Sequence, residues 1–473
     1  MRDGLPLTGM VPLLLYGALA GPVPGPCPQA DLPATARCAT VEVFEDRQAA
    51  SGRRIPLAVV VLPATGSPRA ADAVFFIAGG PGQAATRSAA SVAEDYAATR
   101  RTRDVVLVDQ RGTGGSNGLP CVPFPAADIR LYLGMPGPEE VRRCRDALSA
   151  RADLRFYTTE AAVEDLEDVR RALGYERVTL DAGSYGTKVA LRYLARFPRR
   201  VRAAVLRAVN PPGFRIPLPF AAAGQAALDR LIEDCGRDAG CVRAFPDLRG
   251  DLAKVLARLD AGPVPVKVTN PATGQIEATT LERGTYVARL HLLLFSSRLA
   301  SRIPLLVHTA AEGDFSPFAE LSVAFGKAIA DQIDWGMQLS VLCTEDLPLI
   351  TREEAERETR GTFLGPGRIL AAQEHCASWP RGPLPPDHGK PVRSDVPVLL
   401  ISGGIDPATP AHYAEDAART LSRSRHVVIP NGSHVDGGPC VDAIATAFIA
   451  AGNANGLDTS CVEAIRRPEW VLR

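Results

Sequence analysis

The sequence predicts an α/β fold: a mostly parallel central sheet flanked by helices, with a mainly helical cap inserted before the last core strands. Strand-like runs rich in valine and isoleucine alternate with amphipathic helical stretches from Cys38 to Val209. The alternation stops between about residues 214 and 390, where helical stretches surround one expected hairpin, VPVKVTNPATGQIEAT. It resumes near the C-terminus with VPVLLISGG and RHVVIPNGSH. Strands that alternate with helices indicate a parallel sheet, and the interruption indicates an insertion.

The N-terminal stretch MRDGLPLTGMVPLLLYGALAGPVPGPC holds an apolar run from Met10 to Ala20. A membrane-spanning helix needs ~20 apolar residues, so stable membrane insertion is not expected. The run fits the core of a signal peptide, with Ala18, Leu19 and Ala20 as a small-residue cleavage site. We predict a signal peptide over 1–20 and a secreted or periplasmic protein. The alternative is a disordered leader.

Charge and cysteine content restrict the class of protein further. The chain has 53 basic and 53 acidic residues, so no net charge draws it to nucleic acid, and no nucleic-acid partner is expected. Its ten cysteines are an even number with local spacing, which suits five disulfides in an oxidising compartment. The alternative is ten buried thiols. No C-x-x-C or H-x-x-x-H grouping is present, so no metal site is predicted.

The expected strands before residue 210 end in turns suited to a site. After the strands CATVEVFEDR and RRIPLAVVVLPA, the run AVFFIAGGPG is a buried strand that leads into a glycine-rich turn, and DVVLVDQRGTGGS repeats that plan. An amphipathic helix then precedes the strand RVTLDA, a turn, and the helix TKVALRYLARF, which Pro198 ends. We therefore divide the mature chain into a first core part over 21–213, a cap over 214–390 and a C-terminal core part over 391–473.

The stretch DAGSYGTK holds the candidate nucleophile, Ser184. It resembles the nucleophile turn G-x-S-x-G, except that Ala182 replaces the first glycine. Small residues are needed there because the serine projects from a crowded turn between a strand and a helix. The alternative is a glycine-rich loop without catalytic function.

A serine nucleophile requires a base and an acid. Of seven histidines, His434 alone follows a late strand in a short polar turn near the C-terminus. Asp406 follows the preceding strand, which gives the chain order Ser…Asp…His of this kind of triad. The alternative for an aspartate after a strand is a turn residue. The backbone N–H groups of Tyr185 and of Gly80, in AGGPG, are the candidate oxyanion donors.

Together, FFIAGGPGQ, DQRGTGGS, AGSYGT, the Asp406 loop and the His434 turn resemble the prolyl and tripeptidyl aminopeptidase branch of the α/β-hydrolases. The segments CATVEV, SVLCTEDLP, CASWP and LDTSCV extend the resemblance over nearly the whole mature chain. It implies an α/β-hydrolase fold, a Ser184–His434–Asp406 triad and no cofactor. The implied substrates are short peptides cleaved from a free N-terminus. The chain departs from the branch at Ala182 and at Ala78, where the branch often has histidine.

The same resemblance suggests two disulfides, Cys343–Cys376 and Cys440–Cys461. Nearness in the chain favours Cys121–Cys144 and Cys235–Cys241, and Cys27–Cys38 remains. Members of the branch bind the free amine of the substrate with cap carboxylates, for which Glu345 and Asp346 in CTEDLP are our candidates. The alternative for two adjacent carboxylates is a helix cap or a solvated turn. Arg111 and Asp109 in DQRG are expected to be structural.

Two rival functions share these residues. A carboxylesterase acting on small acyl esters would use the same triad, and only the cap would distinguish it from a peptidase. A catalytically silent binding protein would keep the fold without a reactive serine. The sequence does not specify the number of residues released or the oligomeric state.

Overall fold

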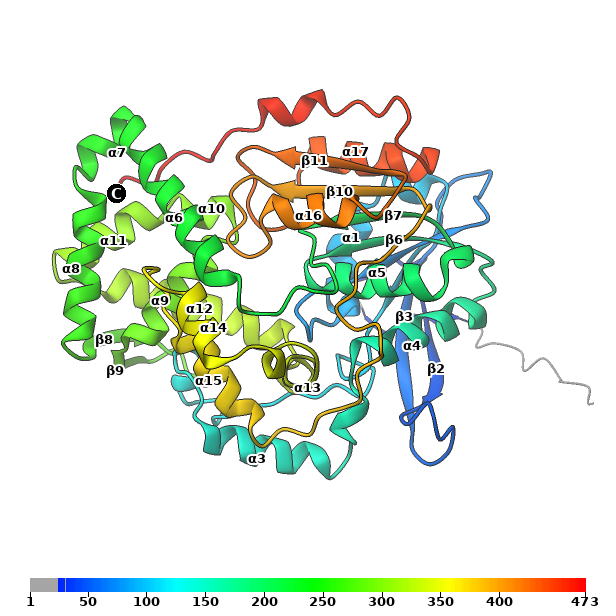
Figure 1. The fold of residues 1–473 in the computed structure, drawn as a ribbon, viewed down its shortest axis with the longest axis horizontal. Helices are drawn as coiled ribbons and strands as arrows, with labels where there is room; N and C mark the ends of the chain where they lie inside the picture. The colour runs from blue at the N-terminus through cyan, green and yellow to red at the C-terminus, as the bar shows by residue number, and fades with distance from the viewer. Residues whose placement is uncertain (1–23, 30) are drawn as a thin grey trace, which may run out of the picture.

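The computed structural model describes residues 24–29 and 31–473, so the predicted signal peptide over 1–20 lies outside the described residues. Its centre is a nine-stranded sheet with the strand order β1-β2-β3-β5-β4-β6-β7-β10-β11 (Figure 1). The strands are β1 (Gly25–Pro26), β2 (Arg37–Phe44), β3 (Arg54–Leu62), β4 (Ala73–Ile77), β5 (Val105–Val108), β6 (Val178–Gly183), β7 (Val201–Arg207), β10 (Val398–Gly403) and β11 (Ser424–Ile429).

The sheet is mostly parallel, as predicted. From β5 through β4, β6, β7 and β10 to β11, every neighbouring pair is parallel, whereas β1, β2 and β3 form an antiparallel edge that joins β5. Every residue of β5 and β10 is buried, which is typical of parallel strands covered on both faces. The polar turns that follow β6, β10 and β11 therefore meet at one edge of the sheet.

Helices cover both faces of this sheet. One face packs against α1 and α17 in one apolar cluster, and the other packs against α3, α4, α5 and α16 in a second cluster. These helices and the remaining ones of this part are α1 (Ala89–Asp95), α2 (Arg130–Leu133), α3 (Pro138–Ser149), α4 (Thr159–Ala172), α5 (Tyr185–Arg196), α16 (Ala411–Ala418) and α17 (Pro439–Ala451). Short 3₁₀ turns are η1 (Ala85–Ser88), η2 (Thr99–Arg101), η3 (Leu154–Phe156), η4 (Pro198–Arg200) and η6 (Ser460–Ala464).

No strand of the sheet comes from the chain between β7 and β10, and this helical segment forms the left side of Figure 1. Much of it has its own apolar core, in which the rings of Tyr286 and Phe318 stack with centroids 4.1 Å apart. The α13 and α15 helices pack instead with the core of the sheet. The elements are α6 (Phe220–Arg237), α7 (Ala239–Ala244), α8 (Leu248–Asp260), β8 (Val264–Thr269), β9 (Ile276–Leu281), α9 (Arg283–Leu293), α10 (Ser297–Ala300), α11 (Ile303–Ala311), α12 (Ser316–Gln332), α13 (Trp335–Glu345), η5 (Leu347–Leu349), α14 (Arg352–Glu358) and α15 (Gly367–Cys376).

Two distant parts of the chain join the helical core. Tyr132 and Leu133 of α2 belong to its buried cluster, although they precede it by some way in the sequence. The C-terminal tail also crosses to it (Figure 1): Arg467 Nε lies 2.7 Å from Asp234 of α6, and Trp470 packs against the cluster. Contacts with α2 and with the C-terminal tail therefore attach the helical part to the rest of the protein, in addition to its two chain connections. The division into 21–213, 214–390 and 391–473 stays a prediction.

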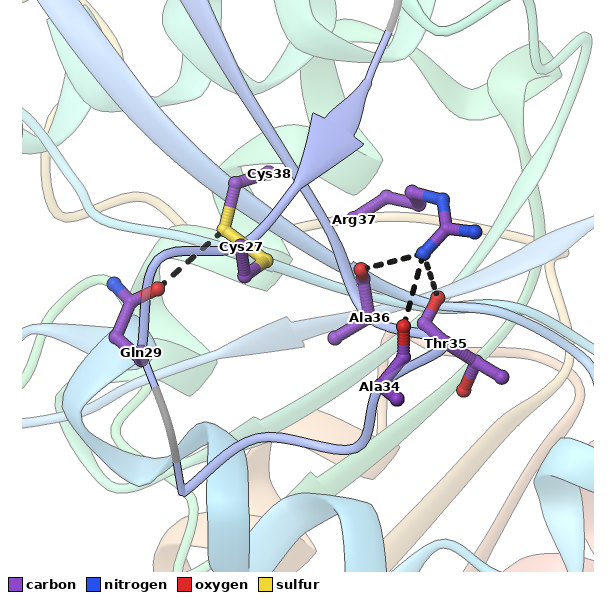
Figure 2. The surroundings of a disulfide bond; sticks show 7 residues. All are labelled: Cys27, Gln29, Ala34, Thr35, Ala36, Arg37 and Cys38. Carbon is purple, nitrogen blue, oxygen red and sulfur yellow. Dashed lines mark hydrogen bonds between the residues drawn. A yellow bond between two sulfur atoms is a disulfide. The ribbon is translucent and has the colours of Figure 1, made fainter.

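Five disulfides are present, as predicted, and no cysteine in the described part of the chain is free. Cys27 follows β1 and Cys38 lies in β2, so the first pair closes the N-terminal antiparallel edge (Figure 2). Beside it, Arg37 Nη1 donates to three successive backbone carbonyls of the turn before β2. The pairs are Cys27–Cys38, Cys121–Cys144, Cys235–Cys241, Cys343–Cys376 and Cys440–Cys461.

Candidate active site

Ser184 stands between β6 and α5 with φ 54° and ψ −129°. A positive φ is rare for a residue with a side chain, and it projects the serine out of the turn instead of along the strand. Its N–H donates to the Arg207 carbonyl at 2.9 Å, and its carbonyl accepts from the backbone N–H and the hydroxyl of Thr187. These contacts hold the strained turn, which leaves the Ser184 side chain partly exposed.

Close packing explains which small residues this turn requires. A Cβ at Gly186 would lie 2.4 Å from the Ile77 carbonyl oxygen and 2.8 Å from that of Ala78. A Cβ at Gly79 would lie 3.2 Å from the Cβ of Ser184. Ala182, in contrast, is buried in the apolar cluster beneath the turn, where its methyl group has room. The missing first glycine therefore does not prevent the turn.

His434 comes from the turn after β11 and meets Ser184. Its Nε2 lies 2.9 Å from Ser184 Oγ, so the hydroxyl can donate to the ring. The turn packs tightly against the end of β10, because a Cβ at Gly403 would lie 2.1 Å from the Ser433 carbonyl oxygen. Ser433 N also donates to an Asp436 carboxylate oxygen at 2.7 Å. The position of the imidazole thus follows from the packing of two neighbouring parallel strands.

Asp406 lies on the other side of the ring, where His434 Nδ1 is 3.0 Å from Oδ1 and 2.9 Å from Oδ2. A carboxylate accepts, so Nδ1 carries the proton and Nε2 is free to accept from Ser184. Burial raises the pKa of Asp406, but the neighbouring His434 and the N–H groups of Thr409 and Ala408 outweigh it and lower that pKa below its usual value. The carboxylate is therefore charged at neutral pH.

The glycine-rich loop after β4 lies against the Ser184 turn. An ideal Cβ on Gly79 would be 3.7 Å from Tyr185 N, and Gly80 has φ 106°, a conformation that favours glycine. Tyr185 is the first residue of α5, so its N–H has no partner within the helix. The assignment of the Gly80 and Tyr185 N–H groups as oxyanion donors stays a prediction.

Glu345 and Asp346 lie at the end of α13 and are both buried. Glu345 accepts from Thr159 N and Thr159 Oγ1 at 2.7 Å each, and Asp346 lies 2.8 Å from Lys188 Nζ. Burial raises the pKa of both carboxyl groups, and the nearby Lys188 opposes the rise. The predicted amine-anchoring role stays a prediction, and these contacts give both side chains a structural role.

Arg111 and Asp109 are buried and bonded within the protein. Arg111 makes two contacts with Asp165, at 2.6 and 2.7 Å, and Asp109 accepts from Thr86 N at 2.8 Å and Gly115 N at 2.9 Å. These networks hold the loops that follow β5. Neither residue was predicted to react.

Two neighbours of the site were missed by sequence reasoning. Thr409 Oγ1 donates to Asp406 Oδ2 at 2.8 Å, and its position three residues after an aspartate is a turn signal that could have been used. Phe295, just after α9, meets the His434 ring edge-on with centroids 4.8 Å apart. Nothing in its local sequence indicates this contact, because it depends on how the helical part lies over the sheet.

Two family models match parts of this chain. The family model described as alpha/beta hydrolase fold matches residues 72–244, and the model described as TAP-like protein matches residues 363–461. The solved proline iminopeptidase of Mycobacterium smegmatis covers 87% of this chain and 98% of its own, at 16% identity and a TM-score of 0.44.

Curated relatives align over nearly the whole chain. Serine protease Hip1 of Mycobacterium tuberculosis is 26% identical over 92% of this chain and 89% of its own. Tripeptidyl aminopeptidase of Streptomyces lividans is 27% identical over 93% of this chain and 86% of its own. Carboxylesterase B of Mycobacterium tuberculosis is 29% identical over 90% of this chain and 86% of its own.

The fold and the matched family models make this chain an α/β hydrolase. Its C-terminal segment matches the model described as TAP-like protein, and its relatives include a serine protease and a tripeptidyl aminopeptidase. It is an enzyme, and the relatives favour a peptidase over an esterase.

Proposed function

We propose that this chain is an aminopeptidase that releases N-terminal residues or short peptides through an acyl-enzyme. The observation that carries the proposal is the continuous hydrogen-bonded chain from Ser184 Oγ to His434 Nε2, at 2.9 Å, and from His434 Nδ1 to Asp406, at 2.9 Å. Each of the three groups comes from the end of a different strand of the sheet. The amino-terminal specificity is taken from the tripeptidyl aminopeptidase to which the chain is similar.

The geometry supports a two-step acyl transfer. Ser184 Oγ attacks the substrate carbonyl carbon while its proton passes to His434 Nε2, and the charged Asp406 stabilises the imidazolium. The N–H groups of Tyr185 and Gly80 receive the oxyanion. The imidazolium then protonates the leaving amine, and the C–N bond breaks. A water molecule, activated by the same imidazole, hydrolyses the ester on Ser184.

The first experiment tests the nucleophile. A fluorophosphonate probe should label the wild-type protein once, at Ser184, and Ser184→Ala should lose labelling and on the order of 10⁶ in kcat. Thr187→Ser is the matched control, because it keeps the hydroxyl that supports the turn. Wild-type protein that resists the probe would point to the catalytically silent binding protein instead.

The second experiment tests the substrate class with peptide amides and small acyl esters, each with a free or a blocked N-terminus. A peptidase should cleave free-amine peptides, and ester turnover that exceeds every amide would favour the carboxylesterase. That second candidate is supported by the 29% identity to carboxylesterase B. It is also supported by the burial of Glu345 and Asp346, whose contacts lie within the protein.

The amine anchor is tested separately with Glu345→Gln. If Glu345 binds the substrate amine, the preference for a free over a blocked N-terminus should fall at least about tenfold, because a charged contact is lost. If its role is to hold Thr159, the preference should stay as in the wild type while stability changes. Asp46→Asn, a change in the turn between β2 and β3 that bonds neither Glu345 nor Thr159, serves as the control.

We further propose that the protein works in an oxidising compartment outside the cytoplasm. Five disulfides support this, because such bonds persist where thiols are not kept reduced. None of the helices in the described part of the chain is both long and apolar enough to cross a membrane. Fractionation of the native host should place the protein outside the cytoplasm, with an N-terminus beginning near residue 21.

A further inference from the structure

Two partly buried arginines of the helical part have no acidic partner within the described residues. Most little-exposed arginines here do have one: Arg111 pairs with Asp165, and Arg192 pairs with Asp387. Arg368 of α15 and Arg289 of α9 form no ion pair in the part of the chain that the structure describes. Their hydrogen-bonding contacts are one each, Arg289 Nη2 to the Tyr132 carbonyl oxygen at 2.7 Å and Arg368 Nη1 to His291 Nδ1 at 3.3 Å.

The α9 and α15 helices that carry the two arginines contact each other, and the two positive charges are costly to desolvate. Desolvation lowers the pKa of Arg289 to about 10, and desolvation together with repulsion from Arg289 lowers the pKa of Arg368 to about 10. Both groups therefore remain charged at neutral pH. Each keeps part of its surface exposed, so a small ligand can reach it. A partly desolvated charge without a counter-ion is costly, so an anionic ligand bound beside it would be stabilising.

A chain of ring contacts connects Arg368 to the candidate active site. The Arg368 Cζ is 5.2 Å from the centroid of the Phe220 ring, and its Nη1 contacts His291. The His291 ring meets Phe295 with centroids 5.1 Å apart, and Phe295 meets His434 at 4.8 Å. Two aromatic layers thus separate the Arg368 guanidinium from the proposed base.

His291 fixes the direction of the guanidinium. Burial lowers the pKa of His291 to about 3, helped by Arg368, so its ring is neutral. Its Nε2 lies 3.0 Å from the Pro407 carbonyl oxygen, which assigns the proton to Nε2 and leaves Nδ1 to accept from Arg368. Gly224 makes room for the ring, because a Cβ there would lie 2.6 Å from His291 Cδ2.

The remaining donors are arranged to bind an anion. His291 occupies Nη1 of Arg368, which leaves its Nε and Nη2 without a protein acceptor among the described residues. Contact with the Phe220 ring leaves the in-plane N–H groups of a guanidinium available. A planar carboxylate can accept from two such N–H groups at once. The Arg289 guanidinium adds a second positive charge that attracts the same carboxylate.

We propose that Arg289 and Arg368 form a subsite that binds a carboxylate of the substrate, so that the enzyme prefers acidic substrates. This inference rests on the proposed function. Two sources supply the same chemistry: the C-terminal carboxylate of a short peptide, and an aspartate or glutamate side chain within it. Both would place one negative charge beside the guanidinium pair while the scissile carbonyl lies at Ser184.

Matched peptides separate the two sources. One pair has the same sequence with a C-terminal carboxylate or carboxamide, and another has a carboxamide end with an internal Glu or Gln. Wild-type enzyme should prefer the charged member of one pair by about tenfold or more in kcat/KM, as expected for a charged hydrogen bond. If neither pair shows a preference, the subsite is wrong, whatever the variants do.

Variants then test whether the two arginines cause the preference for charged substrates. In Arg368→Gln and Arg289→Gln the ratio of charged to neutral kcat/KM should fall about tenfold, carried mainly by KM, and Arg368→Lys should restore part of it. Arg298→Gln is the control, because Arg298 is exposed and forms no ion pair among the described residues. Fluorophosphonate labelling measures whether the Ser184 site of each variant is intact. Equal losses on charged and neutral substrates would overturn the proposal.

An ester pair distinguishes this inference from the proposed function. 4-Nitrophenyl hydrogen suberate and its methyl ester differ by one negative charge and need only a serine hydrolase. If no peptide is cleaved, the aminopeptidase proposal fails, and the ester pair still tests the arginines. If peptides are cleaved and both pairs lack a charge preference, the aminopeptidase proposal stands and the subsite fails.

Discussion

Ala182 and Gly186 are the two small residues that flank the Ser184 turn, and they pack in different surroundings. Ala182 packs its methyl group into the core below the sheet, whereas Gly186 lies against the carbonyl groups that end β4. The sequence pattern treats the two positions alike. The structure shows that only the second has no space for a side chain.

This difference predicts the effect of substitution. Gly186→Ala should displace the turn, lower kcat/KM about 100-fold and slow fluorophosphonate labelling, because displacements near 1 Å have this effect. Ala182→Gly should keep activity within a few-fold and cost about 0.5–1 kcal/mol of stability, the penalty for glycine in a strand. Labelling rates and urea unfolding measure both. A harmless Gly186→Ala would contradict the packing argument.

Substitution of Asp406 tests its predicted role in orienting His434. Asp406→Asn should keep the fold and lower kcat by about 10⁴, because an amide can donate to His434 Nδ1 and then favours the wrong tautomer. Steady-state kinetics with a peptide or ester substrate measures the loss. Activity near the wild-type level would remove Asp406 from the mechanism.

The lowered pKa of Asp406 also sets a pH dependence of stability. A carboxyl group whose pKa is lower in the folded than in the unfolded protein stabilises the fold at pH values above its unfolded pKa of about 3.9. This stabilisation is lost as the pH falls through the pKa of the folded state. The difference in unfolding free energy between wild type and Asp406→Asn should therefore shrink as the pH falls below about 4. Urea unfolding on both sides of that pH checks it, and a difference that grows in acid would contradict it.

Between elements, the buried ion pair of Lys188 and Asp346 connects α5 to the end of α13. Both side chains are almost fully buried, so each depends on the other for compensation. The helix that begins at the proposed nucleophile is thereby attached to the helical part of the chain.

Removal of one charged side chain of this ion pair should lower the free energy of unfolding more than removal of both. Lys188→Met should lower the free energy of unfolding by about 3–5 kcal/mol, because it leaves a buried carboxylate unpaired. The double variant Lys188→Met, Asp346→Leu should recover most of the loss. Urea unfolding of the wild type, the two single variants and the double variant gives the coupling. Additive losses would show that the pair is not coupled.

For the whole molecule, the disulfides differ in the length of chain that they close. Cys343–Cys376 closes 33 residues and connects α13 to α15, whereas Cys235–Cys241 closes 6 residues. The longer loop loses more entropy in the unfolded chain when it is closed.

Paired substitution to alanine should follow that order. Removal of Cys343–Cys376 should cost about 4 kcal/mol and removal of Cys235–Cys241 about 2 kcal/mol in the chain-entropy account. Thermal and urea unfolding of the two double variants checks the ranking. The reverse order would show that native packing, and not loop closure, dominates.

The amino-acid sequence was enough to predict the alternation of strands and helices, the interruption between β7 and β10, and the order of Ser184, Asp406 and His434. These follow from local apolar periodicity and from turn residues at strand ends, which a linear pattern records. The folded structure was needed to show that Ala182 has room, that Glu345 and Asp346 bond within the protein, that Phe295 meets the His434 ring, and that Arg368 contacts His291. Such contacts join segments far apart in the chain, and their free energy depends on packing and desolvation, which no local pattern contains.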